Sequence, residues 1–179
     1  MPELLKDPVL QEQMIQAINN GKIFVYPTDT VYGLGCDATN DLAVLKLRSI
    51  KNAKHALSVI APSKKWILDN CNVPDESFLD KLPGKITLIL EKKKHSLGAC
   101  SPNEKIGVRI PNHPITKIIQ QAGVPFVTTS ANVSGQRVVT TIATLPPELY
   151  VDYIIDDGEH SPIPSEIWDL TGNKPEKLR

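Results

Sequence analysis

Polar residues that could bind a ligand gather at four places, each beside an apolar stretch of the sequence. The segments are "YPTDTVYGLG" at 26–35, "RSIKNAKHAL" at 48–57, "IGVRIPNHP" at 106–114 and "VTTSANVSG" at 127–135. They supply hydroxyls, cations and an arginine, whereas no Ser-His-Asp, Cys-His or metal-ligand spacing is evident. Such side chains suit the positioning of a nucleotide and a small zwitterion better than covalent catalysis, and no metal site is predicted.

The first segment combines two threonines with two glycines. The hydroxyls of Thr28 and Thr30 can each donate and accept hydrogen bonds. Gly33 and Gly35 permit a positive φ and a close approach of a ligand to the backbone. The alternative interpretation is a turn in which Asp29 and the threonines satisfy their own backbone.

Cations characterise the second and third segments. Lys51 and Lys54 fall at the C-terminal end of a predicted helix, where they either complement the helix dipole or bind phosphate oxygens. Arg109 stands between two apolar residues of a predicted strand. Because burying an unpaired guanidinium is costly, Arg109 should point into a cleft or toward a partner, and its planar fork suits a carboxylate. The alternative is an ordinary arginine on an edge strand.

The fourth segment places hydroxyls and an amide directly after a predicted strand. Thr128, Ser130 and Asn132 follow one another at every second position. At the carboxyl end of a strand, such groups and the exposed backbone N–H groups form a plausible cradle for an anion or a nucleotide. The segment lacks the spacing of a P-loop, so a different kind of nucleotide site is predicted.

Alternating helices and strands must position these segments. A helix is predicted over 8–20 with Asp7 as its cap, and a second helix begins at Asn40 or Asp41 and ends near Lys51. Further helices are predicted to start at 63 and to span 75–82 and 113–121. Strands are predicted at 22–26, 56–61, 85–90, 105–111, 124–131 and 151–157. A last short strand follows a turn at 171–173. The predicted fold class is α/β, a single domain over 1–179 whose twisted mixed sheet has flanking helices.

Composition and charge narrow the class of protein. The chain has 179 residues, 41% of them hydrophobic, and no apolar run long enough to span a bilayer. The N-terminal "MPELLKDPVL" lacks the order of a signal peptide, and three cysteines without a CxxC spacing indicate free thiols in a reducing cytoplasm. Residues 46–117 carry 14 Lys and Arg against 6 Asp and Glu, which indicates a surface that meets an anion; solvated helix faces are the alternative.

Three motifs, "YPTDTVYGLG", "IGVRIPNHPI" and "PFVTTSANVSG", resemble in their order and approximate spacing the YrdC-type threonylcarbamoyl-AMP synthases. The resemblance runs from about residue 8 to the C-terminus. It implies a nucleotidyltransferase that converts L-threonine, bicarbonate or CO2 and ATP into threonylcarbamoyl-AMP and pyrophosphate, for the modification of tRNA next to the anticodon. It also implies an α/β sheet with a large concave basic cleft, Mg²⁺ that accompanies ATP, and no bound prosthetic group.

Motif positions in this family imply roles for individual residues. The first segment would line the pocket for threonine, and Arg109 would clamp the threonine carboxylate. The resemblance places L-threonine against Thr28, Thr30, Arg109, Thr128 and Ser165, and ATP against Lys51, Lys54, Ser130, Asn132 and Arg179. Lys51 and Lys54 would meet the ATP phosphates and are the candidate catalytic residues.

The chain departs from the family pattern at three points. Ala53 stands where the family has an arginine in its Lys-x-Arg motif, and the segment is shorter than usual. Glu166 stands where the family has a threonine, and the sequence stops at Arg179, without the additional C-terminal domain of longer members. We expect either that Lys54, or less effectively His55, supplies the missing cation, or that the enzyme is slow.

A second class of function is open on the sequence alone, a YrdC-like RNA-binding protein without synthase activity. Its basic face would bind tRNA, rRNA or other double-stranded RNA through phosphates, with a strong dependence on salt. The aromatic content of 5% argues against recognition of single-stranded bases by stacking. A synthase, by contrast, would hand its product to downstream threonylcarbamoyl transferase proteins.

Overall fold

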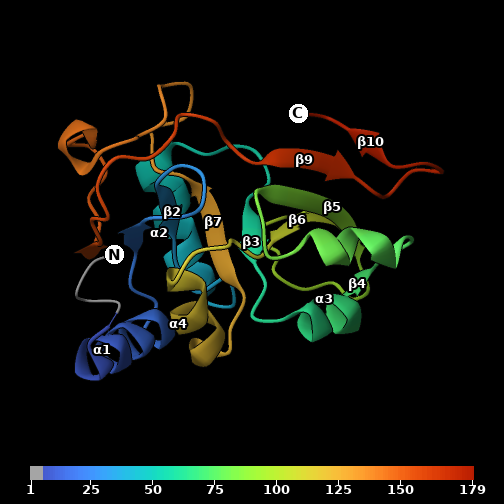
Figure 1. Cartoon of the computed structure of the whole chain (residues 1–179), viewed down its shortest axis with the longest axis horizontal. Helices are drawn as coiled ribbons and strands as arrows, with labels where there is room; N and C mark the ends of the chain where they lie inside the picture. Colours follow the sequence, from blue (N-terminus) through green and yellow to red (C-terminus); the bar gives the residue numbers. More distant parts are fainter. Residues whose placement is uncertain (1–5) are drawn as a thin grey trace.

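Residues 6–179, which the computed structural model of the chain describes, contain ten strands that join in one sheet (Figure 1). The strands are β1 Phe24–Tyr26, β2 Gly33–Gly35, β3 Ser58–Ile60, β4 Cys71–Asn72, β5 Ile86–Lys92, β6 Lys105–Arg109, β7 Phe126–Ser130, β8 Tyr153–Ile154, β9 Glu166–Asp169 and β10 Glu176–Lys177. The prediction about a signal peptide falls partly on residues 1–5, outside the described part of the chain.

The sheet is mixed, as predicted from the irregular alternation of helices and strands. Its order is β10-β9-β5-β6-β3-β7-β2-β1-β8, and β4 pairs with β5. The pairs β1–β8, β3–β6 and β5–β9 are parallel, whereas the other neighbours are antiparallel. Strands from the middle and the tail of the sequence are therefore interleaved, which brings distant polar segments together.

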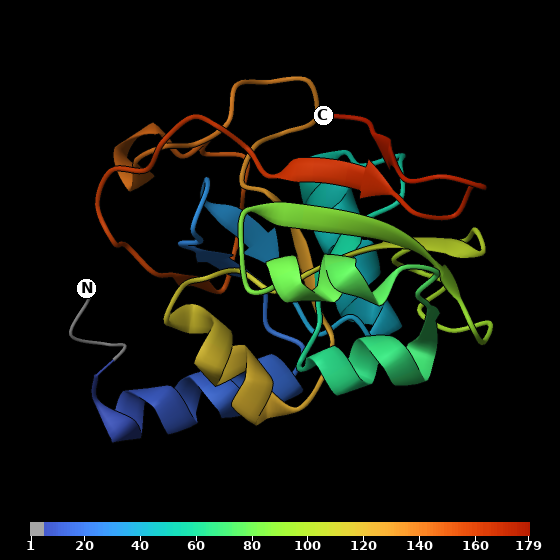
Figure 2. The same cartoon turned by 45° about the vertical axis from the view of Figure 1, so that its right-hand side comes forward.

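Helices cover both faces of the sheet. Helices α1 (Pro8–Asn19) and α4 (Ile115–Ala122) lie side by side in both views (Figures 1 and 2) and pack on the face that carries Phe24 and Tyr26. Helix α2 (Asp41–Lys51) packs with Val25, whose side chain points to the opposite face because side chains alternate along a strand. Within residues 6–179, no helix is long and apolar enough to cross a membrane.

Local capping residues explain where the helices begin. The side-chain oxygens of Asp7, Asn40 and Ser63 accept backbone N–H groups of the first turns of α1, α2 and α3 (Lys64–Asn70), which confirms the predicted starts. Two short 3₁₀ helices follow, η2 over Glu76–Lys81 and η3 over Ile142–Thr144. Gly123 ends α4 with a φ of 74°, a conformation that glycine adopts without strain.

The two glycines of the first polar segment do not use the positive φ that glycine permits. Gly33 and Gly35 form strand β2, which pairs with β1 and β7. Both glycines are required by close approach within the protein. A Cβ on Gly33 would lie 2.7 Å from the Tyr26 ring, and one on Gly35 would overlap the carbonyl oxygen of Val127. The strand was missed because glycine has a low β propensity.

Candidate active site

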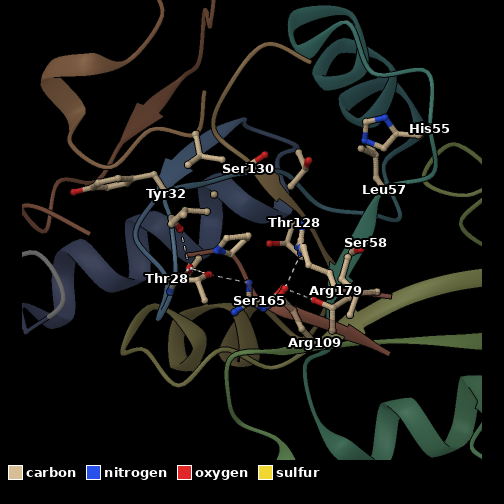
Figure 3. A pocket seen from close by; sticks show the side chains of 18 of the residues that line it. Thr28, Tyr32, His55, Leu57, Ser58, Arg109, Thr128, Ser130, Ser165 and Arg179 are labelled. Atoms are coloured by element: carbon tan, nitrogen blue, oxygen red, sulfur yellow. Dashed lines mark hydrogen bonds between the residues drawn. The ribbon is translucent and has the colours of Figure 1, made fainter. Parts of the chain in front are cut away.

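A pocket of about 310 Å³ lies against the central strands of the sheet (Figure 3). Its wall contains side chains from β3, β5, β6 and β7, together with residues of the turn 28–33, the loop 55–57 and the tail 164–167. Of the residues that the sequence analysis predicted, Thr28, Thr30, Arg109, Thr128, Ser130, Ser165 and Arg179 line this pocket. Its volume is at the lower end of the range for small-molecule sites.

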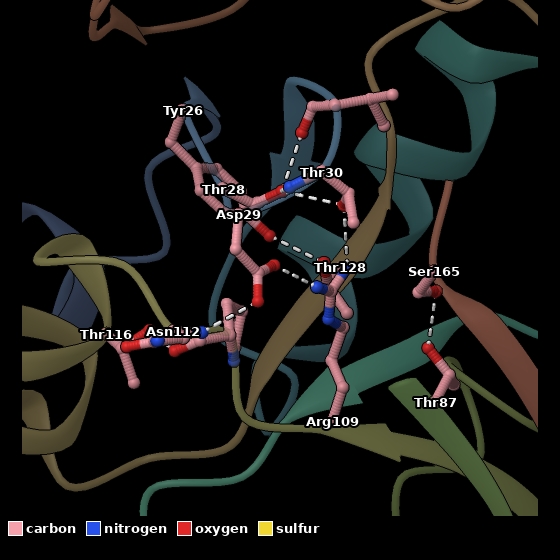
Figure 4. A network of polar contacts seen from close by, with 12 residues as sticks. Tyr26, Thr28, Asp29, Thr30, Thr87, Arg109, Asn112, Thr116, Thr128 and Ser165 are labelled. Atoms are coloured by element: carbon pink, nitrogen blue, oxygen red, sulfur yellow. Dashed lines mark hydrogen bonds and ion pairs between the residues drawn. The ribbon is translucent and has the colours of Figure 1, made fainter. Parts of the chain in front are cut away.

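Arg109 is a buried cation in the pocket wall, with 6% of its surface exposed. Its Nη2 donates to Asp29 Oδ1, and its Nη1 donates to Thr30 Oγ1 at 3.3 Å (Figure 4). Burial lowers the pKa of Arg109, an effect that the charge of Asp29 opposes. Within the described residues its Nε has no hydrogen-bond partner. The sequence analysis predicted the cleft-facing arginine but missed its partner Asp29.

The hydroxyl of Thr28 is fully engaged inside the protein. Its single proton goes to the carbonyl oxygen of Val31 at 2.7 Å, because a carbonyl cannot donate. Its oxygen accepts the backbone N–H of Thr30 at 3.0 Å, so in the 3.0 Å contact between the two hydroxyls Thr30 is the donor. Thr28 therefore holds the turn, and a ligand could bond to its hydroxyl only by replacing one of these bonds.

Thr128 differs from Thr28 because its proton is available to the pocket. The Tyr26 hydroxyl donates to Thr128 Oγ1 at 2.8 Å. Burial strongly raises the pKa of Tyr26, so the phenol keeps the proton that it donates in this bond. Thr128 Oγ1 is an acceptor toward Tyr26, which leaves its own proton for an acceptor on a ligand.

Tyr32, a further lining residue that the sequence analysis missed, fastens the loop after β8 to the turn 28–33. Its hydroxyl lies 2.9 Å from Asp156 Oδ1 and 2.8 Å from the carbonyl oxygen of Gly158, and it accepts the Asp157 N–H. Burial raises the pKa of Tyr32 to about 12. The neighbouring His113 Nε2 lies 2.9 Å from Asp157 Oδ2 and adds a second contact to the same loop.

Lys51 meets Ser130 and Asn132 at the end of β7, although it lies 79 and 81 positions before them in the sequence. Lys51 Nζ donates to the carbonyl oxygens of Ser130 at 2.6 Å and Asn132 at 2.9 Å, and to Asn132 Oδ1 at 3.0 Å. Burial lowers the pKa of Lys51 to about 8, whereas its oxygen partners, which also include Ser130 Oγ at 3.5 Å, favour the charged ammonium. Only Ser130 of the three lines the pocket, so Lys51 supports this turn from behind.

The shortened loop after α2 is held by Arg48, the first residue of the second polar segment. The guanidinium of Arg48 donates to four carbonyl oxygens, those of Ala53, His55, Ala99 and Cys100. Ala53 is 8% exposed and packs in the core. His55 lines the pocket, whereas the neighbouring Lys54 is exposed and outside the lining.

The tail enters the pocket through Ser165 and Arg179. Ser165 Oγ lies 2.9 Å from Thr87 Oγ1, and Arg179 Nε donates to the carbonyl oxygen of Ser165 at 3.1 Å. Glu166, the carboxylate in place of the family hydroxyl, is absent from the lining. Its carboxylate accepts from Lys177 Nζ at 2.6 Å and from the indole of Trp168, and these hydrogen bonds lower its pKa. The substitution therefore adds no charge to the pocket.

The lining of the pocket contains cations but no carboxylate. Arg109 and Arg179 are among its residues, whereas Asp29, which pairs with Arg109, is not. Several cations of segment 46–117 donate to carbonyl oxygens inside the protein and do not line the pocket. Lys92 Nζ donates to the carbonyl oxygens of Ser96 and Ser101, as Lys51 and Arg48 do to the carbonyl oxygens of other loops. A large basic cleft beyond this pocket stays a prediction. Within residues 6–179 no group of three or more His, Cys, Asp or Glu is arranged for a metal.

Comparison with known proteins identifies relatives along nearly the whole chain. A putative threonylcarbamoyl-AMP synthase of Methanocaldococcus jannaschii is 39% identical over 155 residues, which cover 83% of this chain and 73% of that protein. The threonylcarbamoyl-AMP synthase of Blochmanniella pennsylvanica is 31% identical over 183 residues, which cover 96% and 94%.

A crystal structure of P. abyssi Sua5 complexed with L-threonine superimposes with a TM-score of 0.88 at 29% identity. The match covers 97% of this chain and 54% of the Sua5 chain, so this chain spans about half of that protein. The family model Sua5_yciO_yrdC, described as "Telomere recombination", matches residues 16–179. This match and the 39% identity to the Methanocaldococcus protein show that the chain belongs to the Sua5/YciO/YrdC family.

Proposed function

We propose that this protein is a threonylcarbamoyl-AMP synthase, a nucleotidyltransferase that acts in tRNA modification. The observation that carries the proposal is one small pocket in which two arginines and several hydroxyls converge without a carboxylate. Such a lining complements a ligand with a carboxylate and phosphates. The relatives named as threonylcarbamoyl-AMP synthases and the threonine complex of Sua5 support this assignment.

In the proposed reaction, the amine of L-threonine loses a proton and captures CO2 derived from bicarbonate, which gives a carbamate. A carbamate oxygen attacks the α-phosphorus of ATP; a new P–O bond forms, the bond to the β-phosphate oxygen breaks, and pyrophosphate leaves. Arg109 and the free proton of Thr128 would hold the threonine carboxylate. Thr28 and Thr30 would keep Arg109 and the turn in place, and Ser165 would contact the rest of the amino acid.

The nucleotide half of the proposal uses the cluster at the end of β7 and the tail. Ser130 and Arg179 would contact ATP from the pocket wall, and Asn132 would order the turn that carries Ser130. Lys51 would either hold this turn in place or reorient its side chain toward the phosphates. The exposed side chain of Lys54 would supply a mobile cation for the phosphates. ATP would bring Mg²⁺, whose ligands would include phosphate oxygens.

Pyrophosphate release tests the proposal. The synthase should release pyrophosphate from ATP only when L-threonine and bicarbonate are both present, and omission of either should abolish the signal. Lys54→Ala should lower the rate on the order of 10²-fold, whereas Lys117→Ala, which removes another exposed lysine, from α4, should not. Release that is independent of threonine would refute the proposal.

The RNA-binding alternative is decided in the same experiment. Salt-dependent binding of tRNA without threonine-dependent pyrophosphate release would favour it. If the synthase is correct, we propose a cytoplasmic protein whose product passes to threonylcarbamoyl transferase proteins, because the product serves tRNA modification.

A further inference from the structure

Thr87 forms a hydroxyl pair with Ser165 inside the pocket. Their oxygens lie 2.9 Å apart, both residues line the pocket, and each is 6% exposed (Figure 4). Thr87 belongs to β5 and Ser165 immediately precedes β9, which pairs with β5 in parallel. A threonine within "KITLIL" is an ordinary strand residue, so the sequence alone gave no reason to select it.

The sheet register places this pair beside Arg109. Strands β5 and β6 are antiparallel with Leu88 opposite Val108, and continuing the register by one residue sets Thr87 opposite Arg109. A Cβ on Gly107 would lie 3.4 Å from Thr87 Cγ2, so the methyl group of Thr87 faces Gly107 while its hydroxyl meets Ser165. A ligand that binds Arg109 by its carboxylate therefore has the hydroxyl pair next to it.

The pair keeps capacity both to donate and to accept hydrogen bonds, which distinguishes it from Thr28 and Thr128. Thr28 has used its proton and both lone pairs, and Thr128 offers a proton while its oxygen accepts from Tyr26. In the Thr87–Ser165 pair one proton lies between the two oxygens, which leaves one proton and several lone pairs. Within residues 6–179 neither hydroxyl has another hydrogen-bond partner.

A group that both donates and accepts matches this capacity best. A carboxylate only accepts, and the arginines and Thr128 already provide donors for it. An ammonium only donates. We propose that Thr87 is a specificity residue, and that its pair with Ser165 binds the β-hydroxyl of the amino acid substrate. The inference rests on the proposed function for the identity of that substrate, and it adds Thr87 as the residue that selects for the hydroxyl.

Direct binding of two amino acids tests the inference without requiring turnover. L-Threonine and L-2-aminobutyrate differ only in the β-hydroxyl, so their ratio of dissociation constants, measured by calorimetry, isolates recognition of that group. Thr87→Val preserves shape and β-branching and removes the hydroxyl. It should reduce the preference for threonine by roughly five- to tenfold, since a neutral hydrogen bond contributes about 1 kcal/mol and 1.4 kcal/mol is tenfold. Thr87→Ser should keep most of the preference.

Thr116→Val is the matched control. Thr116 is also a threonine with 6% exposure, but its hydroxyl donates to the Pro111 carbonyl oxygen, and it is not among the lining residues. This control should leave the ratio unchanged even if it lowers stability. Ser165→Ala removes the other half of the pair and should reduce the same ratio, which keeps the test available if Thr87→Val does not fold.

Equal weakening of both amino acids by Thr87→Val and Ser165→Ala would overturn the inference, because the pair would then only support the wall. A parent protein that binds neither amino acid would overturn it as well. If the parent prefers threonine and Thr87→Val loses that preference, yet no pyrophosphate is released from ATP, the proposed function fails while the inference stands.

Discussion

Asp29→Asn tests whether the buried ion pair with Arg109 stabilises the pocket. Asparagine keeps the shape of the side chain and one carbonyl oxygen, so the substitution removes charge without removing volume. The two side chains are only 6% and 7% exposed, and the guanidinium would be left buried without a counter-charge. Breaking a buried pair in this way typically costs about 3–5 kcal/mol. For a chain of this size, this should lower the melting temperature by about 6–20 °C.

Thermal and urea unfolding followed by circular dichroism measure the effect, and Asp37→Asn is the matched control. Asp37 is a buried aspartate whose Oδ1 accepts from the backbone N–H and the hydroxyl of Thr39, which an asparagine oxygen can still do. The control should therefore cost no more than about 1 kcal/mol.

A double-mutant cycle separates the ion pair from the packing around it. Removing both charges in Asp29→Asn with Arg109→Gln should cost clearly less than the sum of the two single substitutions, because neither partner is left as an uncompensated charge. Additive costs, or a fall in melting temperature below about 2 °C for Asp29→Asn, would refute the view that this pair stabilises the pocket.

Three further predictions follow from the site. Arg109→Lys should weaken L-threonine binding about ten- to hundredfold with ATP affinity nearly unchanged, because lysine lacks the planar fork that makes two parallel hydrogen bonds to a carboxylate; equal losses in calorimetry would exclude this role. Because burial lowers the pKa of Lys51 to about 8 from its ordinary 10.5, the folded protein releases this proton before the unfolded chain does. Relative to Lys51→Met, the free energy of unfolding of the parent should therefore rise between about pH 8 and 10.5, and a constant difference in urea unfolding would contradict it. Ala53→Arg should not accelerate pyrophosphate release and should lower stability, because Ala53 is 8% exposed in the core. If Ala53→Arg is much faster than the parent and Lys54→Ala is as active as the parent, Lys54 does not replace the arginine that the family has at position 53.

The starts of the helices could be predicted because capping is local. Asp7, Asn40 and Ser63 each accept a backbone N–H two or three positions further on, so the information lies within one turn of the helix. Strand β2 could not be predicted in this way. The glycines that weaken its local propensity are required by Tyr26 and by strand β7, which come together only in the folded chain.

The site was predictable as a set of residue types but not as a network. A carboxylate between two threonines gave no sign that Asp29 pairs with Arg109, 80 positions away. The direction of the Lys51 side chain was equally hidden, because a lysine at the end of α2 can turn to solvent, to a phosphate or, as here, to the carbonyl oxygens behind β7. Which partner it takes is decided by tertiary packing.

The insertion of β9 beside β5 has a consequence for how the protein acquires its binding capacity. Ser165 reaches Thr87 across 78 positions of sequence, so the pocket closes only after the tail joins strands formed by earlier parts of the chain. Long-range pairing of this kind slows folding, and partly folded chains should have no affinity for the ligand. A ligand would then stabilise only the fully assembled protein by mass action. Saturating ligand should slow amide hydrogen exchange in β1 and β9 alike, while leaving the rate of refolding unchanged.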